Sequence, residues 1–213
     1  MSFPSRGLYV ITRAGYPGLH QLTGAVAAAL RGGAAVVQYR AKPPATDPAG
    51  EAAALLAVCR QAGIPLIIND DVGLAAAIGA DGVHLGREDG SLVAARQRLG
   101  PHAIIGLSCY DDIDRAGRAV AMGASYVAFG RFFPSSTKPD APCAHRETLS
   151  IARERLKVPV VAIGGITLAN APGLLAAGAD VLAVIEGVFG EDDPESAASG
   201  FRSLWENAAE LES

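Results

Sequence analysis

The sequence predicts an α/β fold class, a single (β/α)8 TIM barrel, and three observations support this. Short apolar runs alternate with longer Ala- and Leu-rich stretches along the chain. The apolar runs are unbroken, which is typical of parallel strands that helices cover on both faces. A Gly-Ala pair ends the helix before every second strand, at 33–34, 79–80, 123–124 and 178–179. The chain is therefore predicted to consist of four βαβα units, which together supply eight strands.

Apolar runs and the turn residues between them define the first four strand–helix pairs. The run at 8–12 predicts a strand, and the Ala- and Leu-rich stretch at 19–31 predicts a helix that ends at a Gly-Gly turn. Gly63-Ile64-Pro65 introduces the third strand, because Gly and Pro interrupt regular structure. The next three strands are predicted at 35–40, 66–69 and 82–85, with helices at 48–61, 72–78 and 91–99.

The second half of the chain repeats the alternation. Strands are predicted at 104–108, 126–130, 159–163 and 181–185, and helices at 111–122, 146–156 and 168–177. A C-terminal segment, 194–213, is predicted to cover the barrel as a helix from about Pro194 to Leu211. A closed barrel is favoured over an open doubly wound sheet, because no glycine-rich turn follows Ile11-Thr12.

The composition predicts one domain over residues 1–213 with a small-molecule function. The chain is 50% hydrophobic, enough to bury one large core. Its 18 basic and 22 acidic residues are well mixed, which argues against a nucleic-acid or membrane partner but allows a small anionic ligand. Three cysteines without metal-site spacing, and the lack of a long apolar segment, predict a soluble cytoplasmic protein. The oligomeric state stays open, and a homodimer is compatible with the sequence.

Two carboxylate clusters follow neighbouring predicted strands. Asn69-Asp70-Asp71 ends the third strand, and Glu88-Asp89 follows the fourth. In a barrel, the segments after the strands share one mouth, where the active sites of this fold lie. Each cluster alone is typical of solvated strand-end caps and turns. Together with the basic loops nearby they favour a Mg²⁺ site, because one or two carboxylates, water and substrate phosphate are the usual ligands of this ion.

The placement of lysine indicates anion binding at the same mouth. The chain has three lysines against fifteen arginines, and two of the three, Lys42 and Lys138, follow predicted strands. An ammonium group is a compact point charge that suits phosphate. Gln38, Arg40 and Lys42 occupy alternate positions, so in an extended chain their side chains are expected to face the mouth together.

Two further segments predict a second anion site. The long connection 130–139 carries hydroxyl side chains before Lys138, which suits a loop that closes over a phosphate. Gly164-Gly165 ends the seventh strand and Glu186-Gly187 follows the eighth, where barrels commonly bind phosphate through backbone N–H groups. Glycine is expected there because a Cβ would block the anion. Two anion sites at one mouth predict two phosphorylated small-molecule substrates.

Four segments together resemble the thiamine phosphate synthase family, whose members join a hydroxymethylpyrimidine diphosphate to a thiazole phosphate. The resemblance extends from Leu8 to about Phe189. The segments are Gln38-Tyr39-Arg40-Ala41-Lys42, Ile68-Asn69-Asp70, 82–89 (GVHLGRED) and 133–138 (FPSSTK). They are similar to the family's Gln-Leu-Arg-Glu-Lys, Ile-Asn-Asp, Gly-Val-His-Leu-Gly-Gln-Glu-Asp and Phe-Pro-Thr-x-Thr-Lys.

The resemblance implies a complete set of site residues. Asp70 and Asp89 would bind Mg²⁺, which bridges the diphosphate. The pyrimidine diphosphate site would comprise Gln38, Tyr39, Arg40, Ala41, Lys42, Asn69, Ser108 and Lys138, with Arg40, Ser108 and Lys138 as its catalytic residues. The thiazole phosphate site would comprise Ser135, Ser136, Thr137, Gly165, Ile185 and Glu186. The implied reaction is dissociative: pyrophosphate leaves, a pyrimidine methyl cation forms, and the thiazole nitrogen attacks it without a protein nucleophile. A carboxylated tautomer of the thiazole is also compatible.

Some residues depart from the family's pattern or are assigned to packing. Glu186 stands where the family commonly has serine, and its carboxylate is expected to repel a phosphate unless the side chain points away. Asp71 and Arg87 are expected to be neighbours of ligands. His84, inside the fourth strand, is expected to be packed and hydrogen-bonded rather than a ligand.

Three other functions stay open. A thiazole tautomerase relative would share the thiazole phosphate pocket but would not need Asp70, Asp89 and Lys138 as a set. A sugar-phosphate isomerase or epimerase would need a paired acid and base across the mouth. A binding protein for a thiamine precursor would bind both ligands without turnover.

Overall fold

The protein is a closed barrel of eight parallel strands surrounded by helices, which confirms the predicted fold class. The computed structural model describes residues 1–41, 47–87, 90–134 and 142–211. The strands follow one another in sequence order, and the last pairs with the first. They are β1 (Gly7–Ile11), β2 (Ala34–Tyr39), β3 (Leu66–Asn69), β4 (Gly82–Leu85), β5 (Ile104–Tyr110), β6 (Tyr126–Phe129), β7 (Val160–Ile163) and β8 (Val181–Val184).

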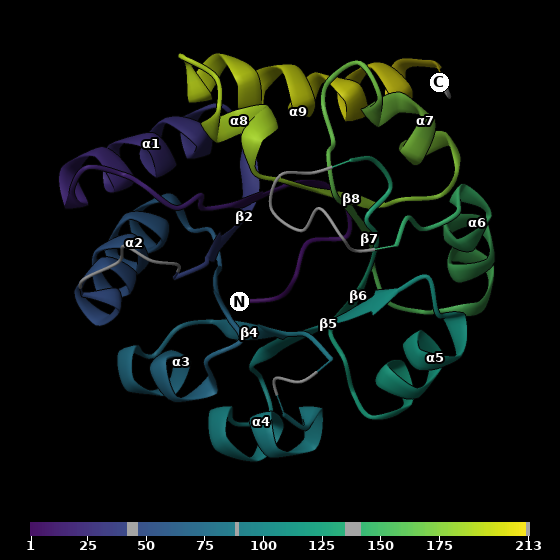
Figure 1. Ribbon diagram of the computed structural model, residues 1–213, viewed down its shortest axis with the longest axis horizontal. Helices are drawn as coiled ribbons and strands as arrows, with labels where there is room; N and C mark the ends of the chain where they lie inside the picture. Colours follow the sequence, from purple (N-terminus) through teal and green to yellow (C-terminus); the bar gives the residue numbers. More distant parts are fainter. Residues whose placement is uncertain (42–46, 88–89, 135–141, 212–213) are drawn as a thin grey trace.

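Helices form a ring outside the strands, as the view along the barrel shows (Figure 1). They are α1 (Leu19–Arg31), α2 (Pro48–Ala62), α3 (Val72–Ile78), α4 (Leu92–Leu99), α5 (Ile113–Ala121), α6 (Arg146–Arg155), α7 (Ala171–Ala176), α8 (Glu186–Phe189) and α9 (Pro194–Leu211). The predicted alternation is therefore present along the described chain. The C-terminal helix α9 packs against α1 and α8.

The structure departs from the predicted elements at two places near the eighth strand. Helix α7 begins at Ala171 and not at residue 168. The Asn170 amide accepts a hydrogen bond from the Thr167 backbone N–H and donates one to the Gly165 carbonyl, so residues 167–170 form a separate turn. The four-residue helix α8, directly after β8, has no separate prediction in the sequence, because one helical turn is too short to show a period.

Two cores result from the alternation of side chains along the strands. Outward-facing residues pack between the barrel and the helices, whereas inward-facing residues such as Tyr9, Val36 and Tyr126 fill the barrel. The ring of Phe3 stacks on the ring of Tyr126, with centroids 3.8 Å apart. The N-terminus accordingly lies at the centre of the view in Figure 1. Phe3 and the inner core fill the barrel from the N-terminal side, and the opposite end stays available for a site.

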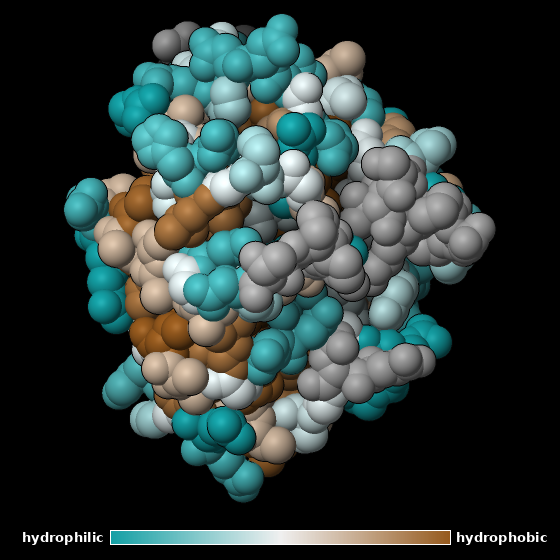
Figure 2. Space-filling model, turned by 60° about the vertical axis from the view of Figure 1, so that its left-hand side comes forward, coloured by the Kyte–Doolittle hydropathy of each residue, from teal (hydrophilic) through white to brown (hydrophobic). Residues whose placement is uncertain are grey.

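The surface that includes the α1–α3 side is hydrophilic over much of its area, with hydrophobic residues visible between the polar ones (Figure 2). In the described part of the chain, no helix combines the length and the apolar character that crossing a membrane requires. The homodimer that the sequence leaves open stays a prediction.

Candidate active site

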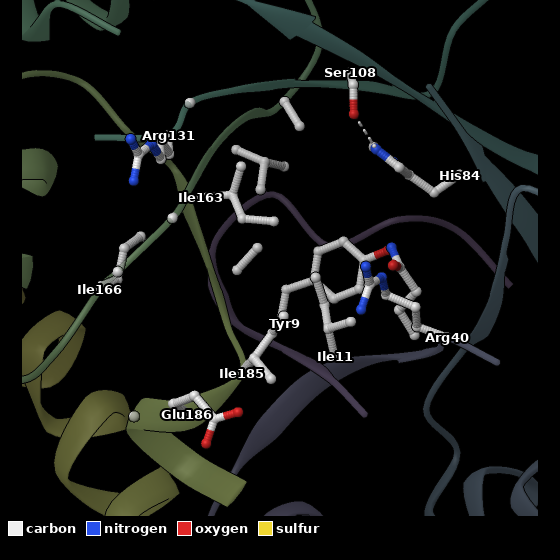
Figure 3. A pocket seen from close by; sticks show the side chains of 18 of the residues that line it. Tyr9, Ile11, Arg40, His84, Ser108, Arg131, Ile163, Ile166, Ile185 and Glu186 are labelled. Carbon is white, nitrogen blue, oxygen red and sulfur yellow. Dashed lines mark hydrogen bonds between the residues drawn. The ribbon is translucent and has the colours of Figure 1, made fainter. Parts of the chain in front are cut away.

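All eight strands contribute to one cavity of about 360 Å³ at the C-terminal end of the barrel. Alternate residues of a strand point to the same side, so each strand supplies one or two inward-facing side chains. Those strand residues are Tyr9, Ile11, Gln38, Asn69, His84, Ser108, Tyr110, Ala128, Val161, Ile163 and Ala183. In the close-up, Ser108, His84 and Arg40 lie on one side, and Ile163, Ile166 and Glu186 lie on the other (Figure 3). The cavity thus has polar side chains on one side, and on the other it combines isoleucine side chains with the charged Arg131 and Glu186 (Figure 3).

Strand β2 divides its predicted site residues between two faces. Gln38 and Arg40 line the cavity. Tyr39 points the other way: its ring is buried in the outer core, and its hydroxyl donates to Glu51 Oε2 at 2.6 Å. Ala41 is exposed and does not line the cavity. Strand alternation explains the separation, so Tyr39 and Ala41 are next to the site and do not form its wall.

Arg40 brings a cation to the polar side of the cavity. Its backbone N–H donates to Thr12 Oγ1 at 3.0 Å, which ties the end of β2 to the end of β1. Burial lowers the pKa of the Arg40 guanidinium from its ordinary value, and the negative charge of Asp70 partly opposes that effect. An arginine still remains protonated, so this group is a permanent positive charge that faces the cavity.

The two aspartates after β3 have different partners. Asp71 is the N-cap of α3, and its Oδ1 accepts the Leu74 backbone N–H at 2.8 Å. Asp70 has a positive φ of 64°, and its backbone N–H donates to the His84 carbonyl at 2.8 Å. The Asn69 amide donates to Asp70 Oδ2 at 2.5 Å. Asp70 is therefore held at the end of β3, directly beside β4, the strand that leads to Asp89.

The donor chemistry around Asp70 is compatible with a hard cation. Its carboxylate accepts a hydrogen bond from the Asn69 amide, and the oxygen ligands that Mg²⁺ needs are one or two carboxylates with water and phosphate. Among the described residues, no three His, Cys, Asp or Glu side chains are grouped so that they alone could hold a metal. Asp89, the second predicted ligand, lies outside the described residues, so the Mg²⁺ site stays a prediction.

A chain of hydrogen bonds connects the polar residues of five strands. Gln38 Nε2 donates to the Tyr9 hydroxyl at 2.7 Å, and the Tyr9 and Tyr126 hydroxyl oxygens are 2.9 Å apart. His84 Nδ1 lies 2.9 Å from the Tyr126 hydroxyl, and His84 Nε2 lies 2.8 Å from Ser108 Oγ. The last of these bonds is drawn in Figure 3. His84 is buried and hydrogen-bonded, as the sequence predicts, and it also lines the cavity.

The glycines after β7 serve the packing of the next loop. Gly164 and Gly165 both have positive φ, 104° and 63°. A Cβ on Gly164 would overlap Arg131, and a Cβ on Gly165 would overlap the Pro134 carbonyl. Glycine is needed here because the start of the β6–α6 connection crosses directly over the end of β7. The reason expected from the sequence, access for an anion, stays a prediction.

Glu186 is the first residue of α8, and it lies at the edge of the cavity. Its carboxylate oxygen Oε2 is 3.8 Å from Nη1 of Arg13, a residue that follows β1. Both side chains are about half exposed, 54% and 40%. The positive charge of Arg13 therefore offsets the carboxylate that the sequence predicts to be unfavourable beside a phosphate. Ile185 lines the cavity immediately before this helix.

The predicted site residues fall into three groups. Those that the structure brings together around the cavity are Gln38, Arg40, Asn69, Ser108, Gly165, Ile185 and Glu186. Tyr39, Ala41 and Asp70 do not line it, although Asp70 lies next to Asn69 at its rim. Lys42, Asp89, Ser135, Ser136, Thr137 and Lys138 lie outside the described residues.

Sequence reasoning missed Tyr9 and Tyr126, and it favoured wall packing over ligand contact for Tyr110. Tyr9 and Tyr110 line the cavity, and Tyr126 hydrogen-bonds His84 beneath it. Burial raises the pKa of Tyr9 and of Tyr126 above the ordinary value for tyrosine, so both keep their hydroxyl hydrogen. The alternation of side chains along a strand could have identified Tyr9. It is two residues before Ile11, so both side chains point into the barrel.

Comparisons with known proteins agree on one family. Residues 8–188 match the family model described as thiamine monophosphate synthase. The thiamine-phosphate synthases of Methylococcus capsulatus and Halorhodospira halophila are 54% and 51% identical to this chain; the matches cover 96% and 95% of it and 92% and 95% of the relatives. The thiamine phosphate pyrophosphorylase structure from Pyrococcus furiosus has a TM-score of 0.84 at 36% identity, covering 95% of this chain and 96% of that one. This chain therefore belongs to the thiamine monophosphate synthase family.

Proposed function

We propose that the protein is a thiamine-phosphate synthase, which joins hydroxymethylpyrimidine diphosphate to a thiazole phosphate and releases pyrophosphate. The observation that supports it most is a single cavity with two unlike ends. Gln38, Arg40, Asn69 and Ser108 lie at one end, and Gly165, Ile185 and Glu186 lie at the other. Two substrates that must react with each other need such a shared space, because orientation in one site replaces a bimolecular encounter.

The polar end suits the pyrimidine diphosphate. Arg40, Gln38 and Ser108 all line the cavity; the Arg40 guanidinium is proposed to bind diphosphate oxygens, and the Gln38 amide and Ser108 hydroxyl are proposed to bind the heterocycle. Asp70 and Asp89 would hold Mg²⁺ beside the diphosphate, and the bound ion would stabilise the negative charge that develops on the leaving pyrophosphate. Lys42 and Lys138 are proposed to stabilise the same negative charge on the leaving pyrophosphate. The isoleucine side chains at the opposite end suit the thiazole ring, and the phosphate of the thiazole substrate would lie against the backbone of Gly165, Ile185 and Glu186.

The bond changes need no nucleophile from the protein. The bond between the pyrimidine methylene carbon and the diphosphate oxygen breaks, and its electron pair leaves with pyrophosphate. The thiazole nitrogen then uses its lone pair to form the new C–N bond. The Cys109 thiol near this cavity is buried, and burial raises its pKa to about 12, so it is not an activated nucleophile. The remaining task of the chain is to orient both rings and to exclude water with Ile11, Val161 and Ile163.

The reaction itself tests the proposal. The purified protein is mixed with both phosphorylated precursors and Mg²⁺, and thiamine phosphate and pyrophosphate are followed together. Equal amounts of both products, and none after chelation of the metal, are expected. Saturable binding of the thiazole phosphate without product would contradict the proposal and would indicate a tautomerase or a binding protein. We further propose that this reaction occurs in the cytoplasm, which the free cysteines Cys59, Cys109 and Cys143 support.

A further inference from the structure

The hydrogen-bond chain at the cavity has two ends, Gln38 and Ser108, that line its polar side, and three members between them, of which Tyr9 and His84 also line the cavity. We propose that Tyr9, Tyr126 and His84 are positioning residues, which make Ser108 present its hydroxyl hydrogen to the bound heterocycle. The chain joins Gln38 to Ser108 through four contacts of 2.7 to 2.9 Å. The inference rests on the proposed function, because it specifies how the pyrimidine end of that site recognises its ligand.

The direction of the chain follows from its first bond. Gln38 Nε2 donates to the Tyr9 oxygen, so the Tyr9 hydrogen is free to donate to the Tyr126 oxygen. The Tyr126 hydrogen then donates to His84 Nδ1, which must carry a lone pair. The imidazole hydrogen is accordingly on Nε2 and donates to Ser108 Oγ. Every buried hydroxyl donates in this order, as buried polar groups require, and the Ser108 hydrogen is left for the cavity.

The packing around the two tyrosines prevents the hydroxyls from turning to water. Tyr9 is 1% exposed and Tyr126 is fully buried. The Tyr126 ring lies over Gly106, where a Cβ would overlap it, and Phe3 stacks on the same ring. The ring of His84 is also roughly parallel to that of Tyr126, with an interplanar angle of 22°. The hydroxyl of Tyr126 thus has its two partners in the chain and a fixed position between them.

The result is a defined hydrogen-bonding pattern at the polar end of the cavity. Ser108 acts as a donor, which suits an unprotonated ring nitrogen of an aminopyrimidine. One N–H of Gln38 is committed to Tyr9, and its carbonyl oxygen remains an acceptor for an exocyclic amine. A site built to hydrogen-bond one such edge discriminates against analogues that lack it, because its own polar groups are then left unpaired. Tyr126 would contribute to this selection without touching the ligand.

The tautomer of His84 tests the chain directly on the free protein. The protein has four histidines, so an imidazole ¹⁵N spectrum of the labelled protein assigns each ring. We expect His84 to carry its hydrogen on Nε2, and Tyr126→Phe to produce a mixture of tautomers because Nδ1 loses its donor. Phe3→Leu is the matched control: it removes packing from the same ring, keeps every hydroxyl, and should leave the tautomer unchanged. His84 protonated on Nδ1 in the unsubstituted protein, or an unchanged tautomer in Tyr126→Phe, would overturn the inference.

A double-mutant cycle separates positioning from a merely structural effect. Tyr126→Phe should raise KM for the pyrimidine diphosphate roughly fivefold, the value of one hydrogen bond, and change KM for the thiazole phosphate less than about twofold. In a Ser108→Ala background the same substitution should add less than about twofold, because Tyr126 acts through Ser108. Equal losses for both substrates, or losses that multiply with Ser108→Ala, would contradict the inference. Absence of turnover in the unsubstituted protein would instead contradict the proposed function, and the tautomer measurement does not depend on turnover.

Discussion

The adjacent residues Asp70 and Asp71 at the end of β3 have different surroundings, which suit different roles. Asp71 caps α3 through its carboxylate, whereas Asp70 adopts a left-handed backbone conformation at the rim of the cavity. Such a conformation is uncommon for a residue with a side chain and tends to occur at functional sites. The family resemblance selects Asp70 as the metal ligand, and the cap gives Asp71 a separate, structural role.

The two aspartates supply a matched pair of variants. We expect Asp70→Asn to lower kcat roughly 100-fold at a fixed Mg²⁺ concentration, because a neutral amide is a weaker ligand and stabilises less charge. Asp71→Asn should stay within about threefold of the original kcat, because Asn is as good an N-cap as Asp. The measurement is the rate as a function of Mg²⁺ concentration for each variant. Equal losses in the two variants would contradict a metal role for Asp70.

The Glu186–Arg13 pair allows a second prediction, which concerns the effect of the Glu186 carboxylate on thiazole phosphate binding. Glu186→Ser should lower KM for the thiazole phosphate by about two- to fivefold, since it removes a negative charge near the bound phosphate and leaves Arg13 without that partner. Arg13→Ala should raise the same KM, because the carboxylate then has no compensation from this arginine. The measurement is the KM of each variant in steady-state kinetics, in which the concentration of the thiazole phosphate is varied. A higher KM in Glu186→Ser would show instead that the carboxylate contributes to binding.

Residue types at strand ends predict much of the candidate site, because strand alternation brings them together. Gln38 and Arg40 are two residues apart and face the same cavity, whereas Tyr39 between them faces the outer core. The same rule places Tyr9 and Ile11 inside, yet their aromatic and apolar side chains give no local sign of a site. The partner of Tyr9 is Tyr126, which is 117 residues away in sequence. The two tyrosines come into contact because the barrel closes, so the contact cannot be predicted from either strand alone.

At the scale of an element, the connection between β6 and α6 is fixed at both described ends. At its start, Phe133 N donates to the Gly164 carbonyl at 3.1 Å, and Arg131 lies directly beside Gly164. At its end, the Ala144 N–H donates to the Arg131 carbonyl at 2.7 Å. The following residue, His145, bonds Asp111 after β5 with both its backbone N–H and its Nδ1. The base of the connection is therefore tied to both neighbouring strands.

Glycine substitutions test the contact at the start of this connection. Gly164→Ala should lower the free energy of unfolding by about 1–2 kcal/mol for the positive φ and about 1–3 kcal/mol more for the overlap with Arg131. Gly123→Ala is the control: its φ is also positive, 90°, but no atom lies within 4 Å of the new Cβ. It should lose only the backbone contribution. Chemical denaturation of both variants gives the comparison, and equal losses would contradict the packing argument.

The His145–Asp111 pair gives the same connection a dependence on pH. Hydrogen bonding and charge from Asp111 raise the pKa of His145; burial raises the pKa of Asp111, but bonds from Thr148 and His145 outweigh it and lower that pKa. A raised histidine pKa means that the stabilisation is complete below about pH 6.5, the unfolded value, and is lost as pH rises through the folded value. The lowered Asp111 pKa preserves its contribution down to about pH 4.

Thermal unfolding at two pH values tests that sign. His145→Ala should lower Tm more at about pH 5.5, below the unfolded pKa of histidine, than at about pH 8.5, because the raised folded pKa makes the stabilisation fall as pH rises. His102→Ala serves as a control, since His102 is an exposed histidine away from this connection, and its effect on Tm should not change with pH in this way. A larger effect of His145→Ala at the higher pH would contradict the assignment of charges.

At the scale of the whole molecule, eight short apolar runs and four Gly-Ala pairs predict the barrel, because a buried parallel sheet repeats the same pattern at every strand. The short helix α8 and the late start of α7 are not predictable in this way, since the turn that delays α7 depends on a bond between Asn170 and Gly165. Helix α9 packs against α1 and α8. Its Phe201 side chain is fully buried, and Trp205 donates to the Asp180 carbonyl at 3.3 Å.

Removal of the buried ring of α9 should destabilise the whole barrel and not α9 alone. Phe201→Ala is expected to lower the free energy of unfolding by about 3–5 kcal/mol, whereas Leu168→Ala, at a side chain 42% exposed, should cost less than about 1 kcal/mol. Trp205 is the one tryptophan of the chain, so its fluorescence reports on α9 while circular dichroism reports on all helices. Coincident transitions by both probes are expected, and an earlier fluorescence transition would show that α9 unfolds independently.

A structure with thiamine phosphate and pyrophosphate bound together would test the central claim, that one cavity holds both substrates with fixed polarity, most directly. We predict the pyrimidine ring beside Gln38 and Ser108, and pyrophosphate beside Arg40 and Asp70. The phosphate of thiamine phosphate should lie against the backbone that includes Gly165 and Glu186. The reverse orientation of thiamine phosphate in the cavity, or binding of either product outside it, would contradict the account.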